Sequence, residues 1–256
     1  MEDYRELFDL TGRVALVTGA SEGIGRGIAL GLASAGADLI LAARREDMLQ
    51  EVKSDAAKIG RRAEVCVCDV TNLASIAALK AFSLERFGKV DVLVNNACYS
   101  ANRPAWLLGE SDWDRMVDTG LKGVFFVSQI IGSIMREKGY GKIINLSSTF
   151  AKSVYPGAAT YSAIKAAVSH LTESLAVEWA PDGIRVNALA PTAIPTPSRA
   201  ALITPERKAM LIGRIPLGRL GAIEDLIPAA IFLASQASDF VTGHTLFVDG
   251  GWVAKG

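Results

Sequence analysis

Histidine and cysteine are scarce in this sequence of 256 residues. Two histidines, His170 and His244, and three cysteines, Cys66, Cys68 and Cys98, are present. Three cysteines do not make a disulfide framework, and Cys66 and Cys68 have no second pair with which to form a zinc site. Histidine-based catalysis is poorly supported for the same reason. We therefore expect no metal centre, and we interpret the cysteines as small buried side chains in or beside strands.

The sequence also has no long hydrophobic run and no excess of charge. Its longest apolar stretch, residues 123–135, contains Ser128, Gln129 and Ser133 and is too short to cross a bilayer. The acidic start, residues 1–10, lacks the basic-then-apolar layout of a signal peptide. Because 27 basic and 27 acidic side chains cancel, nothing favours a nucleic acid partner. We predict a cytoplasmic protein with a small-molecule substrate and no membrane partner.

Short apolar runs alternate with longer helical patterns along the chain. This alternation is typical of a parallel sheet with helices on both faces, and strands buried on both faces are nearly continuous in apolar residues. We predict one α/β domain over residues 1–256, a doubly wound Rossmann-like parallel sheet of about seven strands. The predicted strands are 14–17, 39–42, 63–68, 90–94, 142–146, 185–189 and 245–248, and the predicted helices lie near 24–35, 46–58, 72–86, 112–137, 157–180 and 224–235.

Residues 191–214 interrupt this alternation. The segment contains four prolines and then a short helical stretch. Long irregular segments in compact domains are usually lids or binding loops. We predict a substrate lid over 191–214, with a surface insertion as the alternative. Trp106, Phe150 and Tyr155 are candidates for an apolar pocket wall, and packing or surface positions are equally consistent with them.

A glycine-rich loop follows the first predicted strand. The sequence TGASEGIG at residues 18–25 leads from that strand into a helix. Glycine permits tight turns and close approach of a ligand to the backbone, and the free N–H groups of the helix can bind a pyrophosphate. The loop therefore indicates a dinucleotide site. Close packing of the helix would also explain the small residues Gly23, Gly27 and Gly31.

A tyrosine and a lysine four residues apart occupy one face of the predicted helix 157–180. Hydride transfer to a ketone leaves an alkoxide, so an acid is needed beside the carbonyl oxygen. Tyr161 supplies a phenol, and the ammonium of Lys165 favours its ionised form. Ser148 follows the fifth predicted strand and can bind the substrate oxygen. A packed tyrosine beside a lysine that reaches toward solvent is the alternative.

Together these motifs resemble the classical short-chain dehydrogenase/reductase family. The resemblance implies an oxidoreductase that moves a hydride between a nicotinamide dinucleotide and a secondary alcohol or ketone, and it implies a homotetramer. The first residues resemble gluconate 5-dehydrogenase-like and 3-oxoacyl reductase-like members. Further matching motifs are Asp69-Val70, Asn95-Asn96-Ala97, Ser147-Ser148, Tyr161-x-x-x-Lys165, Pro191 with Thr196, and Asp249-Gly250-Gly251.

The resemblance also implies roles for individual residues. Tyr161 would be the general acid/base, Lys165 would hold the nicotinamide ribose, and Ser148 would orient the carbonyl. Asp69 and Val70 would contact the adenine, and the Ile194 backbone would hold the carboxamide. The cofactor-binding residues expected in this way are Gly19, Ser21, Glu22, Gly23, Ile24, Gly25, Arg44, Arg45, Asp69, Val70, Asn95, Ala97, Tyr161, Lys165, Pro191, Ile194 and Thr196.

The choice of cofactor depends on charge at the end of the second strand. Family members that select NAD carry an acidic residue where this chain has Ala43, and Arg44 and Arg45 follow. A guanidinium can bind a 2′-phosphate through paired charged hydrogen bonds. We therefore predict NADP(H). NAD(H) remains the alternative, because Glu22 stands where many NADP-using relatives have a basic residue.

Three positions depart from the family pattern. Gly120 replaces an asparagine, Cys98 replaces a glycine, and Thr192 replaces another glycine. Gly120 retains a backbone carbonyl but not the amide side chain that helps to supply protons in relatives. The leading hypothesis is a carbonyl reductase or alcohol dehydrogenase. A 3-oxoacyl thioester reductase is the second hypothesis, which basic residues around the pocket mouth would favour. Gly120 motivates the third, a non-catalytic dinucleotide-binding regulator.

Overall fold

The computed structural model describes residues 3–196 and 204–255. Seven parallel strands form one sheet in the order β3-β2-β1-β4-β5-β6-β7, which confirms the predicted doubly wound α/β class. The strand order reverses between β1 and β4, and ligands bind at such a switch point beyond the carboxyl ends of the strands. The strands are β1 Val14–Thr18, β2 Asp38–Ala43, β3 Ala63–Val67, β4 Val92–Asn95, β5 Gly141–Leu146, β6 Ile184–Pro191 and β7 Thr245–Val248.

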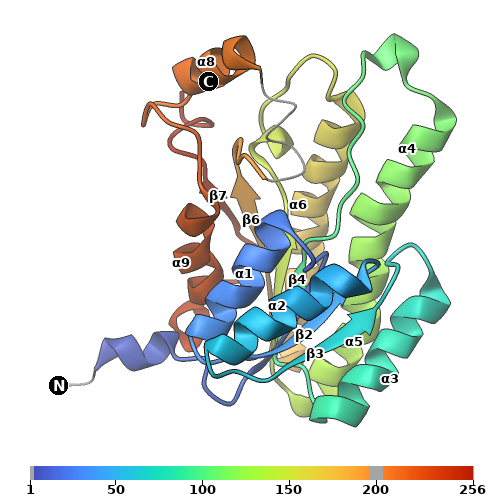
Figure 1. Cartoon of the computed structure of the whole chain (residues 1–256), viewed down its shortest axis with the longest axis vertical. Helices are drawn as coiled ribbons and strands as arrows, with labels where there is room; N and C mark the ends of the chain where they lie inside the picture. Colours follow the sequence, from blue (N-terminus) through green and yellow to red (C-terminus); the bar gives the residue numbers. More distant parts are fainter. Residues whose placement is uncertain (1–2, 197–203, 256) are drawn as a thin grey trace.

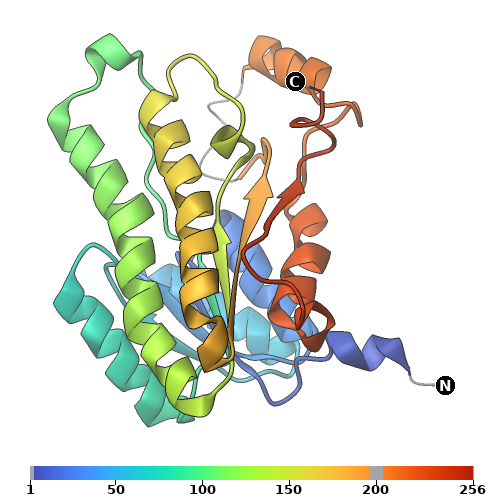
Figure 2. The same ribbon diagram turned by 180° about the vertical axis from the view of Figure 1, so that it is seen from behind.

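Helices cover both faces of the sheet (Figures 1 and 2). One face carries α1 Gly23–Ser34, α2 Glu46–Lys58 and α9 Ile223–Ala234, and their apolar sides form one core with Leu32, Leu49 and Leu226. The other face carries α3 Leu73–Phe87, α5 Gly123–Lys138 and α6 Ala159–Trp179, with a core that includes Ile76 and Ile131. Strands β1, β4 and β5 are buried at every residue, and their sequences are mostly apolar, with Thr18, Asn95, Lys142 and Asn145 as the polar exceptions.

Two glycines of α1 serve helix packing rather than ligand binding. A Cβ on Gly31 would lie 2.6 Å from Ile227 Cγ2 of α9, and a Cβ on Gly27 would overlap the Ile223 side chain. Close packing of the helix, one of the two explanations given above for the small residues of α1, is therefore right for Gly27 and Gly31, and α9 is the helix that they contact. Gly23 faces Thr196 instead.

The predicted helix over 112–137 is not one continuous α-helix. It consists of α4 Glu110–Val117, a π-helical turn over Asp118–Lys122, and α5. Single π turns of this kind are often found at functional sites. A Cβ on Gly120 would lie 3.1 Å from Ile164 Cγ2 of α6, so the π turn passes very close to α6.

The predicted lid segment is described only in part. Its short helical stretch is α8 Pro205–Arg214, and Thr204 caps this helix by accepting a hydrogen bond from the Arg207 N–H. Residues 197–203 lie outside the described residues. Within 3–196 and 204–255, every helix is too short or too polar to cross a membrane.

Candidate active site

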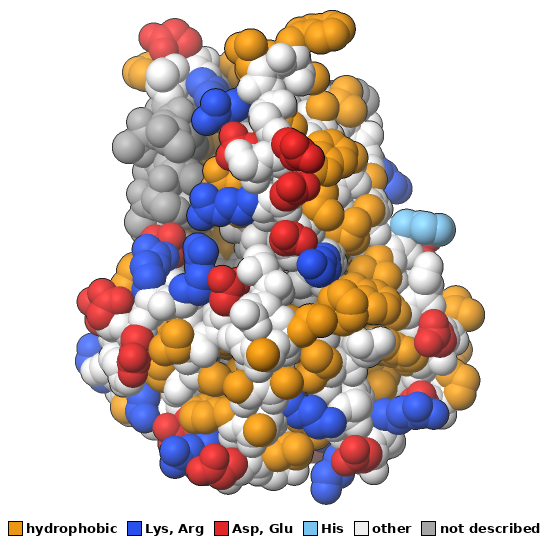
Figure 3. Space-filling model, turned by 90° about the vertical axis from the view of Figure 1, so that its right-hand side faces the viewer, with side chains coloured by type: hydrophobic (Ala, Val, Ile, Leu, Met, Phe, Trp, Pro, Cys, Tyr) orange, Lys and Arg blue, Asp and Glu red, His pale blue; other side chains and the backbone are white. Residues whose placement is uncertain are grey.

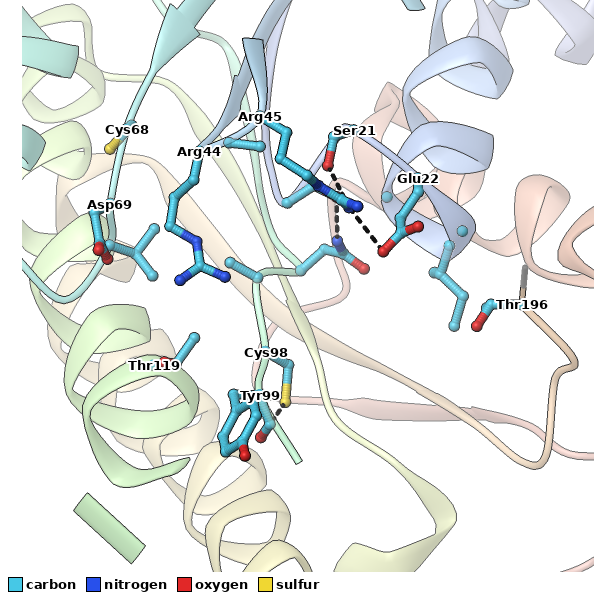
Figure 4. A pocket seen from close by; sticks show the side chains of 18 of the residues that line it. Ser21, Glu22, Arg44, Arg45, Cys68, Asp69, Cys98, Tyr99, Thr119 and Thr196 are labelled. Atoms are coloured by element: carbon cyan, nitrogen blue, oxygen red, sulfur yellow. Dashed lines mark hydrogen bonds and ion pairs between the residues drawn. The ribbon is translucent and has the colours of Figure 1, made fainter. Parts of the chain in front are cut away.

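A cavity of about 280 Å³ opens at the carboxyl ends of β1–β4 (Figure 4). Its wall combines the glycine loop with the residues that follow β2, β3 and β4. The structure thus brings together residues that are far apart in the sequence, as a doubly wound sheet requires. The predicted cofactor residues that line this cavity are Gly19, Ser21, Glu22, Gly23, Ile24, Gly25, Arg44, Arg45, Asp69, Val70, Ala97 and Thr196.

The glycine loop requires glycine at several positions for two separate reasons. Gly19 and Gly23 have φ values of 64° and 58°, in the left-handed region that favours glycine. A Cβ on Gly19 would also lie 2.8 Å from Asn96 Nδ2, and a Cβ on Gly25 would overlap the same amide. The loop therefore lies directly against the chain that follows β4, and its backbone remains open toward the cavity.

Asn96 holds the glycine loop in place. Its Nδ2 donates to Thr18 O at 3.0 Å and to Gly19 O at 3.1 Å, and its backbone N–H donates to Thr18 Oγ1. Our sequence-based selection missed Asn96 and chose its neighbour Asn95. The other lining residues outside its set of cofactor-binding residues are Ala43, Cys68, Cys98, Tyr99, Arg115 and Thr119.

Asn95 does not line this cavity. It is 3% exposed, and its Nδ2 donates to Ser128 Oγ at 2.8 Å and to Asn145 Oδ1 at 2.9 Å. Pro191 ends β6, and Ile194 lines a separate cavity of about 150 Å³ beside the carboxyl ends of β6 and β7. The cofactor contacts predicted for these three residues remain predictions.

Charged side chains surround the part of the cavity beyond β2. Arg45 Nη2 lies 2.8 Å from Glu22 Oε1 and donates to Ser21 Oγ at 3.2 Å. Arg44 extends into the cavity on the side of Asp69 (Figure 4). Burial alone would raise the pKa of Asp69, but hydrogen bonds from Thr71 and the charges of Arg44 and Arg115 hold this pKa below its usual value.

Tyr161, Lys165 and Ser148 lie where β5 ends and α6 begins. Lys165 is 4% exposed, its Nζ donates to Leu146 O at 2.5 Å, and this Nζ lies 5.6 Å from the centre of the Tyr161 ring. Ser148 Oγ accepts a hydrogen bond from the Phe150 N–H at 3.2 Å. The structure thus places an ammonium, a phenol and a hydroxyl within one small region.

This group does not line the cavity beyond β1–β4 but adjoins it. A Cβ on Gly120 would lie 3.1 Å from Ile164, which sits between Tyr161 and Lys165 on α6, and 4.0 Å from the Sγ of the lining residue Cys98. The end of the cavity and the start of α6 therefore meet at the π turn.

An aromatic wall stands beside Tyr161. The Phe150 ring meets the Tyr161 ring edge-on with centres 6.0 Å apart, and it stacks on Tyr155 at 6.3 Å. Arg207 of α8 lies over Tyr155. Trp106, the third candidate for an apolar wall, is 96% exposed and is a surface residue.

The cysteines are not all buried as expected. Cys68 is buried and Cys66 is half-buried, and burial raises the pKa of the Cys66 thiol to about 11. Cys98 is exposed at the cavity, so the prediction was wrong for this residue. Across residues 3–196 and 204–255, no group of three or more His, Cys, Asp or Glu side chains is arranged to hold a metal ion.

Comparison with known proteins places this site in a family. A family model described as enoyl-(acyl carrier protein) reductase matches residues 19–253. Gluconate 5-dehydrogenase of Gluconobacter oxydans is 39% identical over 249 residues, with 97% of each chain covered. 2-Dehydro-3-deoxy-D-gluconate 5-dehydrogenase of Dickeya dadantii is 40% identical over 250 residues, covering 97% of this chain and 98% of the relative. The chain belongs to the classical short-chain dehydrogenase/reductase family.

A solved structure supports the same placement. Gluconate 5-dehydrogenase from Burkholderia cenocepacia, in complex with NADP and tartrate, superposes with a TM-score of 0.95 at 39% identity, covering 98% of this chain and 99% of that one. The predictions of a short-chain dehydrogenase/reductase and of an oxidoreductase of hydroxyl or keto groups are thereby confirmed.

Proposed function

We propose that this short-chain dehydrogenase/reductase interconverts a secondary alcohol and a ketone with NADP(H), and that Tyr161 is its general acid/base. The observation that carries the proposal is the position of Lys165, which is buried at the end of β5 with its ammonium 5.6 Å from the Tyr161 ring. A buried lysine held to Leu146 O is not a residue that reaches toward solvent, which was the alternative explanation of the motif.

The residues of the cavity fit a dinucleotide phosphate. Gly19 and Gly25 leave backbone exposed where a side chain would clash, and such a loop before a helix N-terminus binds a pyrophosphate. Arg44 follows β2, where the adenosine ribose is recognised, and extends into the cavity. NADP bound to the Burkholderia cenocepacia relative supports the same choice. NAD(H) is the alternative cofactor, because the Glu22 carboxylate lies at the same part of the cavity and repels a phosphate.

The chain's own residues would supply the proton transfer. A nicotinamide held at this cavity would supply the hydride for ketone reduction and would accept it in alcohol oxidation. During ketone reduction, Ser148 Oγ–H would donate a hydrogen bond to the carbonyl oxygen, and Tyr161 would pass its phenolic proton to that oxygen as it becomes an alkoxide. The Lys165 ammonium would stabilise the phenolate left behind, because opposite charges attract strongly in a partly desolvated site. In alcohol oxidation the same proton returns to Tyr161.

The substrate class follows from the relatives and the wall beside Tyr161. Relatives named for gluconate and 2-dehydro-3-deoxy-D-gluconate support a hydroxy acid. Reduction of a 3-oxoacyl thioester is the second candidate, because basic side chains gather beside the same wall. Lys152, Arg207 and Arg214 lie over the rings of Phe247, Tyr155 and Trp252.

A substrate screen with a matched variant tests this function. The purified protein is mixed with NADPH or NADH and with sugar acids, simple ketones, secondary alcohols and a 3-oxoacyl thioester, and the nicotinamide absorbance is followed. We expect turnover with NADPH that Tyr161→Phe abolishes, while NADPH binding stays within about twofold. Turnover by Tyr161→Phe at the wild-type rate would refute the assignment. Tight binding without turnover on the whole panel would favour the non-catalytic regulator.

We also propose a cytoplasmic homotetramer. Hydrophobic side chains gather on the face formed by α3, α4 and α5 (Figure 3), and Trp113 of α4 is 48% exposed. Large exposed apolar surfaces on soluble proteins commonly mark protein interfaces. Sedimentation equilibrium measures the mass of the assembly, and a monomer at micromolar concentration would contradict the proposal.

A further inference from the structure

An ion pair joins two loops at the side of the cavity where the adenosine ribose is recognised. Glu22 ends the glycine loop and stands at the N-cap position of α1, yet its side chain makes no capping hydrogen bond. Its carboxylate instead lies 2.8 Å from Nη2 of Arg45, which precedes α2. The same Nη2 donates to Ser21 Oγ, so the guanidinium is held on the glycine loop (Figure 4).

This arrangement places opposite charges where dinucleotide enzymes normally use one sign. In such enzymes an acidic side chain at the end of the second strand accepts hydrogen bonds from the ribose hydroxyls of NAD, and an arginine near that position binds the 2′-phosphate of NADP. Arg44 and Arg45 both favour the phosphate. Glu22 opposes it twice, because its carboxylate repels a phosphate and occupies one of the two guanidinium groups.

We propose that Glu22 is a specificity-determining residue that weakens the preference for NADP(H) by competing with the 2′-phosphate for Arg45. This inference rests on the proposed function only in taking the cavity as the dinucleotide site. Arg44 receives the phosphate directly. Arg45 joins it only after the pair with Glu22 opens. When NAD(H) binds, the ion pair between Glu22 and Arg45 stays intact, so no free energy is spent on breaking it.

The size of the effect follows from the exposure of the pair. The Glu22 and Arg45 side chains are 30% and 49% exposed, so the pair is largely solvated and easily broken. A phosphate with nearly two negative charges displaces a single carboxylate under these conditions. Removing the carboxylate charge should tighten NADPH binding by about 3- to 10-fold, the sum of lost competition and lost repulsion. NADH binding should change by less than about twofold, because it lacks the phosphate.

The test compares Glu22→Gln with wild type by isothermal titration of NADPH, NADH, 2′,5′-ADP and 5′-AMP. The two shorter nucleotides report on the adenosine end without any contribution from catalysis. Glu46→Gln is the matched control, because Glu46 is exposed beside Arg45 but lies outside the cavity lining and, among the described residues, has no ion pair. We expect tighter binding of NADPH and 2′,5′-ADP in Glu22→Gln but not in Glu46→Gln. The increase in affinity should be smaller at high salt, because salt screens the charges.

The Arg45→Gln background separates competition from simple repulsion. If Glu22 acts by holding Arg45, then Glu22→Gln increases the NADPH affinity less in the Arg45→Gln protein than in the wild-type protein. An equal increase of NADPH affinity in both proteins would refute the proposal that Glu22 competes with the phosphate for Arg45. An unchanged ratio of NADPH to NADH affinity in Glu22→Gln would also refute it. If wild type bound none of the four nucleotides, the proposed function and this inference would both fail. If the wild-type protein binds the nucleotides but Glu22→Gln leaves the ratio of NADPH to NADH affinity unchanged, then only the inference about Glu22 fails and the proposed function stands.

Discussion

Replacing Lys165 by methionine tests the electrostatic part of the proposed mechanism. Methionine fills a similar volume without a charge, so packing around the buried stem is largely retained. For a unit charge 5.6 Å from the Tyr161 ring centre, Coulomb's law with an effective dielectric constant of about 20 gives about 3 kcal/mol. If that stabilisation applies to the phenolate formed during the reaction, its loss lowers the rate about 100-fold.

The assay must separate chemistry from cofactor binding and from folding. Single-turnover hydride transfer at saturating NADPH isolates the chemical step, and NADPH titration measures any loss of affinity. Thermal unfolding shows whether the loss of the hydrogen bond to Leu146 O has destabilised the protein. We expect Lys165→Arg to recover part of the rate because it restores the charge. A folded Lys165→Met protein with more than a tenth of the wild-type rate would refute the electrostatic role.

Two further predictions concern the cofactor loop and the loop before α9. Gly25→Ala should weaken binding of either dinucleotide at least about tenfold, because its Cβ would displace Asn96 from the glycine loop; titration that shows unchanged affinity would contradict this role of the loop. Hydrogen bonds from Arg219 and from the Ala222 N–H lower the pKa of Asp225 to about 2. A lowered carboxylate pKa stabilises the fold above the unfolded-state pKa of about 4, and this contribution is lost as pH falls toward 2. Asp225→Asn should therefore lower Tm at neutral pH but not near pH 2, and a constant difference across that range would be inconsistent with the ion pair.

The strands were predictable because of where they lie in the molecule. The seven apolar runs in the sequence correspond to β1–β7, with boundaries shifted by at most about two residues. Strands covered on both faces must be apolar at consecutive positions, and this leaves a clear pattern in the sequence. The glycine loop was equally clear, because its backbone geometry and its contact with Asn96 both exclude larger residues.

The interruption between α4 and α5 could not be read from the sequence. Apolar residues continue at helical spacing across residues 112–137, so the pattern indicates one helix. The π turn instead coincides with close contacts between Gly120 and Ile164, and between Gly123 and Val70 O. These contacts depend on the positions of α6 and of the chain that follows β3. The spacing of apolar residues within 112–137 carries no information about those positions.

Choosing between two adjacent asparagines was also beyond the sequence. Asn95 is the last residue of β4 and Asn96 follows it, and the two neighbouring side chains point in different directions. Both are the same residue type, and their environments decide which one faces the glycine loop. Asn95 turns inward to Ser128 and Asn145, whereas Asn96 faces Gly19. The Glu22–Arg45 pair is a similar case, since it joins two loops that become neighbours only in the folded chain.

Rigid placement of the proposed catalytic pair comes from hydrogen bonds between β5 and α6. Asn145 Nδ2 donates to Thr172 Oγ1 at 2.9 Å, and Ser147 Oγ donates to Lys165 O at 3.0 Å. Lys165 Nζ completes this set by donating to Leu146 O. Buried polar groups that are fully paired fix one arrangement, because any shift leaves a donor or acceptor unsatisfied.

The charges that we propose to select the cofactor lie elsewhere, on the exposed loops before α1 and α2. No residue of that charged group takes part in the hydrogen bonds between β5 and α6 described above. Substitutions at Glu22 or Arg45 can therefore change which dinucleotide binds without moving Tyr161, whereas substitutions between β5 and α6 disturb the proton donor itself. If both proposals hold, cofactor preference and proton transfer are separable. The double variant Glu22→Gln with Lys165→Met should then show changes in NADPH binding free energy that equal the sum of the two single changes within about 0.5 kcal/mol.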